Sequence, residues 1–341
     1  MRSKGWIAAT VVAMGLGVAG PAAAQEKIRF SFTAASMLYA PVYVADTMGY
    51  FRQNGLEAEN IHFKAGGSAA LAAVLGGNVD IYVGAASSAM RAVDKGTDAV
   101  VIGSLMTQFA INAVVRGDIA RERGLTPAST EAERLKALKG LRIGVSGAGS
   151  GTHQIMQYML ARAGLNPERD ATIAFLGGGS DVLAAFLAKR IDAAAFSNPA
   201  SDLAVQKHGG FLLIDGPGGQ LEELNGFQYV TLITSRRWLA RNPDKALRTV
   251  KAFQQALTAM HDPAAAPKAR DSIHPKYFAQ TDKAIFDAAW QALNPAFPKS
   301  IAVEKPHMEK VAKFLNDFSE EKFDVDVTKV YTNELAEAAR K

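Results

Sequence analysis

GGSAALAAVLGGNVD at residues 66–80 returns as GGSDVLAAFLAKRID at residues 178–192, and this pair of stretches decides the fold. Eight of the 15 aligned positions are identical at a constant offset of 112 residues, including two glycines, a serine and the final aspartate. Alanine and leucine are common in this chain, but the shared glycines and aspartate argue against coincidence. A repeat of this length is too long for a solenoid unit, so it predicts two similar lobes.

Strands and helices are predicted to alternate around both copies of the repeat. Before the first copy, Lys27–Thr33 alternates like a strand and Pro41–Gln53 has the apolar spacing of a helix. Before the second copy, Leu141–Val145 is typical of a strand and Gly151–Ala163 of a helix. The predicted fold class is therefore α/β: two lobes, each a doubly wound parallel sheet flanked by helices.

Two apolar segments, Ile111–Val115 and Phe227–Thr234, bracket the second lobe and are expected to be crossover strands that act as hinges. Ligands of doubly wound sheets bind at the carboxyl ends of the strands, so the cleft between the lobes is the expected site. The predicted division is residues 1–24 as a cleaved signal peptide, 25–115 as the first part of lobe 1, 116–226 as lobe 2, and 227–341 as a crossover strand and the helical completion of lobe 1.

The first 24 residues have the pattern of a secretory signal. Arg2 and Lys4 precede an apolar run over residues 5–18, and Ala22-Ala23-Ala24 offers a small-residue cleavage site. The run is shorter than the ~20 residues that a membrane-spanning helix needs. We therefore expect a mature protein exported to a bacterial periplasm.

Charge and composition exclude several classes of function. The formal charge of +5 falls by two when Arg2 and Lys4 are removed, and no basic stripe with interleaved aromatics is present, so we expect no nucleic-acid partner. The chain has no cysteine, which excludes disulfides, thiolate metal sites and cysteine nucleophiles. The six histidines show no metal-ligand spacing, and no nucleophile elbow occurs. We expect no catalytic residues, no metal and no cofactor, and hence no enzyme.

The strongest candidate binding loop is Gly147–His153, which follows a predicted strand and opens a helix. Its glycines allow close approach to the backbone, and exposed N–H groups at a helix start suit an anion. The loop is not a Walker loop, and Thr152 stands where a dinucleotide fingerprint needs its third glycine. We expect ligand contacts from Ser150, Gly151, Thr152 and His153.

Other loops at predicted strand ends should reach the same cleft. Ser68 and Ser180 are expected to cap the helices of the repeat. Tyr39 can stack on a ligand or bond to it. The remaining candidate ligand contacts are Ser36, Met37, Gly67, Ser68, Ala86, Ser87, Asn198 and Tyr229.

Several motifs together carry a family resemblance. APVYVA at residues 40–45 leads to Gly49-Tyr50-Phe51, LKGLRIGV at residues 138–145 leads to Gly149-Ser150-Gly151-Thr152, and Asn242-Pro243 precedes a long helix. Over residues 27–260 the chain resembles periplasmic substrate-binding proteins of ABC importers, in the group of sulfonate, taurine, nitrate and NMT1-like (thiamine-pyrimidine) proteins. The resemblance implies a type II binding-protein fold that delivers a ligand to a membrane permease. It also implies that the loops at Ser36–Tyr39, Gly67–Ser68, Ala86–Ser87, Gly149–His153 and Asn198 line the cleft.

Some relatives in the pyrimidine branch make the thiamine pyrimidine with a cysteine-rich motif, which this chain lacks. The function expected from the sequence is capture of a small organic anion, a sulfonate or carboxylate, by a monomer that closes about a hinge. The alternatives are a neutral heteroaromatic held by Tyr39 and Asn198, an exported enzyme, and a sensor domain that presents its bound ligand to a membrane receptor.

Overall fold

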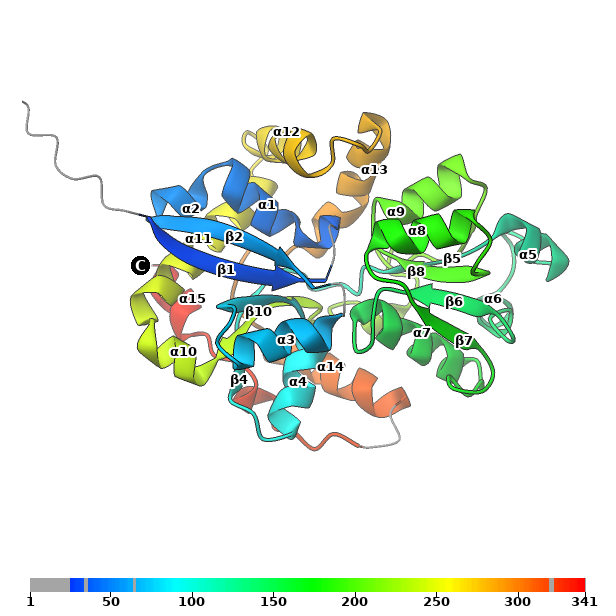
Figure 1. The fold of residues 1–341 in the computed structure, drawn as a ribbon, viewed down its shortest axis with the longest axis horizontal. Helices are drawn as coiled ribbons and strands as arrows, with labels where there is room; N and C mark the ends of the chain where they lie inside the picture. The colour runs from blue at the N-terminus through cyan, green and yellow to red at the C-terminus, as the bar shows by residue number, and fades with distance from the viewer. Residues whose placement is uncertain (1–24, 34–35, 64–65, 319–321, 341) are drawn as a thin grey trace, which may run out of the picture.

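The computed structural model describes residues 25–33, 36–63, 66–318 and 322–340, so the predicted signal peptide lies outside the described residues. Two lobes lie side by side, each built on a five-stranded sheet with helices on its faces (Figure 1). The first sheet has the order β2 (Leu56–His62), β1 (Glu26–Phe32), β3 (Ile81–Ala85), β10 (Val230–Ser235), β4 (Ala99–Ser104). The second has the order β7 (Thr172–Phe175), β6 (Arg142–Val145), β8 (Ala193–Phe196), β5 (Asn112–Val115), β9 (Phe211–Ile214).

The two copies of the repeat occupy equivalent places in the two lobes. The first copy forms α3 (Gly67–Leu75) and leads into β3, the third strand in the order of its sheet. The second copy forms α8 (Gly179–Leu187) and leads into β8, the third strand of the other sheet. The prediction of two similar α/β lobes is confirmed.

Each sheet contains one crossover strand that runs against its neighbours, so the sheets are mixed and the expectation of all-parallel sheets is wrong. β10 is antiparallel to β3 and β4, and β5 is antiparallel to β8 and β9. Both lie between two partners, which satisfies their backbone groups on both edges. β5 pairs inside the second sheet, so the structure groups its residues with lobe 2 although the sequence placed them at the end of lobe 1.

The final aspartate of the repeat ties neighbouring strands together in both lobes. Asp80 accepts hydrogen bonds from the backbone N–H of Arg29 (2.8 Å), the Arg29 guanidinium (2.9 Å) and the indole of Trp238 (3.0 Å). Asp192 likewise accepts from the backbone N–H of Arg142 (3.0 Å). Burial alone would raise the pKa of Asp80, but the hydrogen bonds from Arg29 and the charges of Lys245 and Arg29 outweigh it, and its pKa is lowered.

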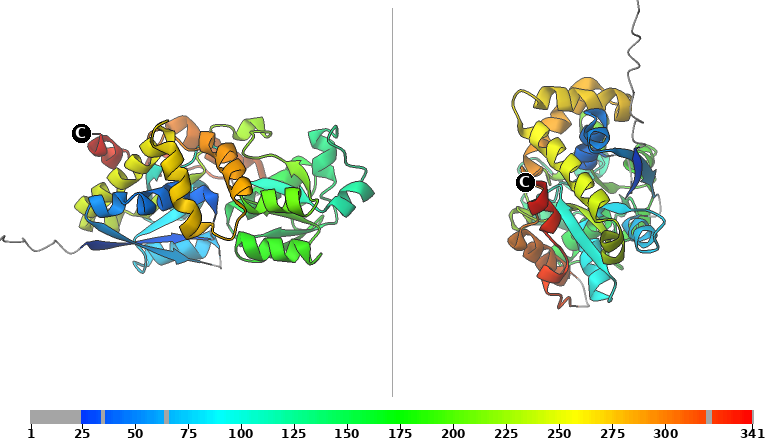
Figure 2. Two further views of the ribbon diagram at one scale, coloured as in Figure 1. Left: turned by 90° about the horizontal axis from the view of Figure 1, so that it is seen from above. Right: turned by 90° about the vertical axis from the view of Figure 1, so that its left-hand side faces the viewer.

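The helices after β10 pack mainly on the first lobe, and one of them also contacts the second lobe. Figure 2 shows the C-terminal helices, yellow to red, lying mainly over the first lobe. α11 (Pro243–His261) packs on α1 (Ala40–Thr47), and α14 (Lys305–Phe318) packs on α4 (Ala86–Asp94) of the first lobe and α7 (Gly151–Arg162) of the second. An aromatic side chain of α14, Phe314, lies 5.4 Å from Phe109 and 4.8 Å from Tyr158, ring centre to ring centre. One helix therefore contacts both lobes behind the cleft.

Replacing Asp80 by asparagine is expected to destabilise the protein by about 3 kcal/mol, because Arg29, Lys245 and the indole of Trp238 lose the charge of this buried carboxylate. The side chain of Asp80 is 4% exposed, whereas that of Asp192 is 25% exposed, so Asp192→Asn should cost less. Urea unfolding of both variants at pH 7 measures the difference.

A comparison of the wild type with Asp80→Asn at different pH values tests the lowered pKa of Asp80. A carboxylate with a lowered pKa stabilises the fold above its unfolded pKa of about 4, and this stabilisation is lost as the pH falls further. The gap in unfolding free energy between the wild type and Asp80→Asn should therefore narrow at acid pH. A gap that stays constant from pH 7 to pH 3 would contradict the role given to this carboxylate.

Candidate functional site

A cavity of about 40 Å³ lies between the lobes, at the carboxyl ends of strands from both sheets. Thr33 follows β1 and Ala85 ends β3 in the first lobe, while Ser146 follows β6 and Ser197 follows β8 in the second. This is the position at which doubly wound sheets bind ligands. The described residues of its wall are Thr33, Ser36, Leu38, Tyr39, Tyr82, Gly84, Ala85, Ile111, Ser146, Ser150, Gly151, Thr152, Gly179, Val182, Ala195, Phe196, Ser197, Tyr229 and Val230.

Six of the predicted contact residues lie in this wall. They come from the loop after β1, from the start of α7 and from the segment before β10, and they are Ser36, Tyr39, Ser150, Gly151, Thr152 and Tyr229. Sequence reasoning found them because each follows or precedes a strand at the cleft edge of its sheet. That they touch a ligand stays a prediction.

The loop before α7 is held in shape by its own hydroxyls. Ser150 is the N-cap: its Oγ accepts the backbone N–H of His153 (3.3 Å) and donates to the carbonyl of Gly147 (2.7 Å). The hydroxyl of Thr152 accepts the backbone N–H of Ser146 (3.0 Å). The N–H groups of the first helical turn, at Gly151 and Thr152, therefore stand at the cavity wall, where the positive end of the helix dipole favours an acceptor or an anion.

The two serines of the repeat do not cap their helices, so that prediction is wrong. α3 and α8 begin at Gly67 and Gly179, and their N-caps are Gly66 and Gly178. Ser68 and Ser180 are thus the second helical residues, two positions after the N-cap, and neither side chain caps its helix. At the start of α8 the side chain that bonds to the N-cap backbone is that of Asp181, whose carboxylate accepts the N–H of Gly178 (3.3 Å).

The remaining predicted residues form contacts around the cavity and do not line it. The backbone N–H of Met37 donates to the carbonyl of Asn198 (3.1 Å) across the lobes, and Ser36 Oγ donates to Ser197 Oγ (2.8 Å). Asn198 turns its side chain toward Asp202, to which its Nδ2 donates (2.7 Å). These bonds join the first lobe to the loop after β8.

A second set of contacts joins α3 and α4 to α7. Ser87 Oγ donates to Gln154 Oε1 (2.6 Å), and Gln154 Nε2 donates to the carbonyl of Gly149 (2.9 Å). A Cβ on Gly149 would lie 2.4 Å from Ser68 Oγ, so the loop presses on the start of α3. Ala86 donates its backbone N–H to the carbonyl of Tyr229 (2.9 Å). Gly67 and Ser68 are thus placed at the contact between the lobes, and Ala86 and Ser87 support it.

His153 is not among the described residues of the cavity wall, and its contact with a ligand stays a prediction. Its Nδ1 accepts the backbone N–H of Gly149 (3.2 Å), and its ring meets that of Phe175 edge-on at 5.1 Å. Burial, with a smaller effect from the charge of Arg91, lowers its pKa. The ring therefore fixes the Gly147–His153 loop in place.

Tyr82 is the most informative wall residue that sequence reasoning missed. It lies within β3, and a Cβ on Gly84 would be 2.0 Å from its ring while one on Gly67 would be 2.6 Å from its hydroxyl. The neighbouring glycines make room for the ring. A side chain in the middle of a strand gives no sign in the sequence of which face it occupies, although the glycine two residues later is a signal of close approach.

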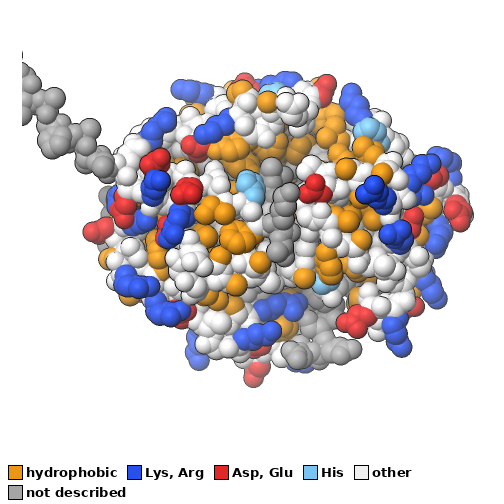
Figure 3. Space-filling model, in the orientation of Figure 1, with side chains coloured by type: hydrophobic (Ala, Val, Ile, Leu, Met, Phe, Trp, Pro, Cys, Tyr) orange, Lys and Arg blue, Asp and Glu red, His pale blue; other side chains and the backbone are white. Residues whose placement is uncertain are grey.

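The described wall contains no Lys, Arg, Asp, Glu or His side chain. Burial raises the pKa of Tyr39, Tyr82 and Tyr229, so their hydroxyls stay protonated at neutral pH. On the face drawn in Figure 3, hydrophobic side chains gather near the junction of the lobes and most Lys and Arg side chains lie farther out. A ligand in this cavity meets hydroxyls, amides and apolar surface.

Within residues 25–33, 36–63, 66–318 and 322–340, no group of three or more His, Asp or Glu side chains is arranged to hold a metal ion. Among the same residues, no helix has the length and apolar character that crossing a bilayer requires.

The two sheets, the crossover strands and the cavity between the lobes define the periplasmic-binding-protein class of fold. The chain belongs to the NMT1-like family, which matches residues 22–273.

Individual relatives are distant. YtlA of Bacillus subtilis (strain 168) is 23% identical over 231 residues, 67% of this chain, and the match spans only 65% of the length of that curated relative. A solved protein from Bordetella bronchiseptica RB50 has a TM-score of 0.81 at 22% identity, covering 92% of this chain and 96% of that one. The alkanesulfonate-binding protein SsuA from Xanthomonas axonopodis pv. citri, solved bound to MOPS, has a TM-score of 0.68 at 18% identity, covering 91% and 98%. These structural similarities show the shared fold.

Ser150→Ala is expected to lower the free energy of unfolding by about 1 kcal/mol, because α7 loses its N-cap. Ser180→Ala removes an exposed serine that does not cap α8, so it should change stability by no more than about 0.5 kcal/mol. Urea unfolding of the two variants measures both values. Equal losses would show that the capping roles are assigned wrongly.

Gly151→Ala is expected to push the lobes apart, since a Cβ there would lie 2.0 Å from the hydroxyl of Tyr229. Gly179→Ala is the matched control: it also begins a helix in the cavity wall, but its Cβ would meet Ala200 at an ordinary 3.6 Å. Small-angle scattering should give a larger radius of gyration for Gly151→Ala alone. Identical radii for the two variants would contradict the close approach of Tyr229 to α7.

Proposed function

We propose that this chain is an exported solute-binding protein that captures a small organic anion, a sulfonate or carboxylate, between its lobes and delivers it to an ABC importer. The observation that carries the proposal is the start of α7 in the cavity wall. There Gly151 and Thr152, whose N–H groups belong to the first turn of α7, lie in the wall together with Ser146. Because no acidic side chain is present in the described wall, nothing there repels an anion.

Closure of the lobes is the proposed mechanism. The hydrogen bonds from Ser36 to Ser197 and from Ser87 to Gln154 join opposite lobes, so they exist only when the lobes meet. A ligand that touches both walls adds contacts to this state and shifts the population toward it. The segments around β5 and β10 connect the lobes and are the proposed hinges.

Delivery and location rest on the family and on the first residues of the chain. The resemblance to SsuA, an alkanesulfonate-binding protein, supports an organic anion as the ligand and an inner-membrane permease as the partner. The signal-like pattern over residues 1–24 supports export to the periplasm. We propose that the closed monomer is the form that the permease recognises.

A neutral heteroaromatic ligand is the second candidate. The described wall contains the rings of Tyr39, Phe196 and Tyr229 and no cationic side chain, which suits an uncharged ring. Asn198, which the sequence also offered for this role, is not in the described wall. The choice between the two ligands therefore depends on whether the amides and hydroxyls at α7 or the aromatic rings dominate binding.

Thermal melts of the chain without residues 1–24 should show stabilisation by small organic anions and none by pyrimidines. The panel is methanesulfonate, taurine, acetate, benzoate, nitrate and a set of pyrimidines. A ligand at 100 times its dissociation constant adds about 2.7 kcal/mol, which for a protein of this size is a shift of roughly 5–10 °C. A shift with pyrimidines alone would overturn the anion and favour the second candidate.

A further inference from the structure

Three tyrosines from separate segments converge on the cavity. Tyr39 lies just before α1, Tyr82 lies within β3, and Tyr229 lies just before β10. Their phenol groups are near enough for the charge of one to disfavour ionisation of another: the pKa of Tyr229 is raised mainly by burial and further by Tyr39 and Tyr82. All three belong to the first lobe and face the space that the second lobe closes.

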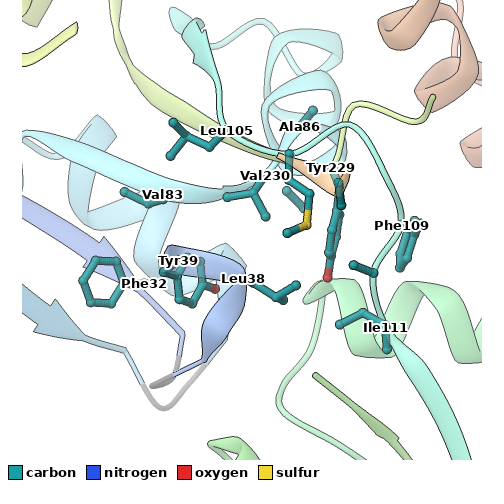
Figure 4. Close-up of a cluster of buried hydrophobic side chains, with 14 of the residues drawn as sticks. Phe32, Leu38, Tyr39, Val83, Ala86, Leu105, Phe109, Ile111, Tyr229 and Val230 are labelled. Carbon is teal, nitrogen blue, oxygen red and sulfur yellow. The ribbon is translucent and has the colours of Figure 1, made fainter. Parts of the chain in front are cut away.

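Each ring is held rigidly. Tyr39 stacks on Phe32 with ring centres 5.1 Å apart, and Tyr229 stacks on Phe109 at 4.4 Å. Figure 4 shows the Tyr229 ring beside Phe109 with its oxygen directed toward the start of a helix of the second lobe. That helix is α7, because the Tyr229 hydroxyl would lie 2.0 Å from a Cβ on Gly151. Rings fixed in this way hold their hydroxyls in place before a ligand arrives, which lowers the entropy lost on binding.

The three phenols line the cavity with protonated hydroxyls. The hydroxyl of Thr33 lies 3.1 Å from the oxygen of Tyr39, and either of the two can be the donor. No carboxylate in the described wall competes for the phenol hydrogens. A protonated phenol that lines the cavity can donate a hydrogen bond to an oxygen of the ligand.

The rest of the described wall is largely apolar. Leu38, Ile111 and Val230 lie in it with Val182 and Phe196 of the second lobe. An oxygen atom placed against these side chains would lose its hydrogen bonds to water without replacement. The cavity has a volume of only about 40 Å³, so the group enclosed here is compact.

We propose that Tyr39, Tyr82 and Tyr229 determine specificity by donating hydrogen bonds to the oxygens of a compact, singly charged anion that carries one apolar end. The anion's charge is then met by neutral donors, the phenols and the amides of α7. A doubly charged anion of the same shape is rejected for two reasons: it has no apolar end for the apolar wall, and desolvating its second charge without a cation is costly. This inference deepens the proposed function and depends on it.

The test compares methanesulfonate with sulfate, which have the same tetrahedral shape but differ by a methyl group and one charge. Isothermal titration of the purified wild-type protein should show methanesulfonate binding at least about 100-fold more tightly than sulfate. Tyr82→Phe and Tyr229→Phe each remove one hydroxyl and keep the ring, and each should weaken methanesulfonate binding about 10- to 100-fold. Tyr50→Phe, on α2 (Tyr50–Gln53) and outside the described wall, should leave the affinity unchanged.

The outcomes separate this inference from the proposed function. Sulfate binding as tightly as methanesulfonate, or Tyr82→Phe and Tyr229→Phe that bind like Tyr50→Phe, would overturn the tyrosine assignment and leave anion capture intact. Wild-type protein that binds neither anion would overturn this inference, and the proposed function falls with it only when acetate and benzoate also fail to bind. Thermal melts of each variant establish that the Phe substitutions keep the fold, so a loss of affinity is assigned to the missing hydroxyl.

Discussion

The structure depends on the exchange of one strand between its two lobes. β10 is reached from the second lobe and completes the first sheet, and β5 is reached from the first lobe and completes the second. Each is hydrogen-bonded on both edges, and every residue of both strands is buried. Leaving these backbone groups unpaired would be far more costly than bending the connections, so the lobes stay joined while their relative angle can change.

The cavity is a consequence of this exchange. Tyr229 immediately precedes β10 and Ile111 immediately precedes β5, so the connections between the sheets themselves form part of the wall. Gly151 lies so close to Tyr229, and Gly149 so close to Ser68, that a side chain at either glycine would clash with the other lobe. Several residues that look like ligand contacts in the sequence are used to join the lobes around the ligand space.

The charged side chains lie outside the described wall of the cavity. The described wall offers only neutral groups, while ionic interactions such as Arg29–Asp80 and Arg116–Asp192 lie where strands begin and hold the sheets together. A neutral, partly apolar enclosure with fixed donors suits the proposed function, in which the ligand is oriented in the cavity and later released. Strong ion pairs would hold such a ligand more tightly and make its release slower.

The two lobes could be predicted from the sequence, because the repeat that ends at Asp80 and Asp192 has the helical period and strand pattern of a βα unit. Both patterns are local properties of the chain. The sequence also located the α7 loop, because the residues between Gly147 and Thr152 signal a strand-to-helix turn. The fold alone shows that β5 and β10 are antiparallel to their neighbours, and that Tyr82 lies in the described wall of the cavity whereas His153 and Asn198 do not. Strand direction and side-chain facing depend on partners more than a hundred residues away, such as Gly84 with Thr231, and neighbouring residues in the chain carry no record of such pairings.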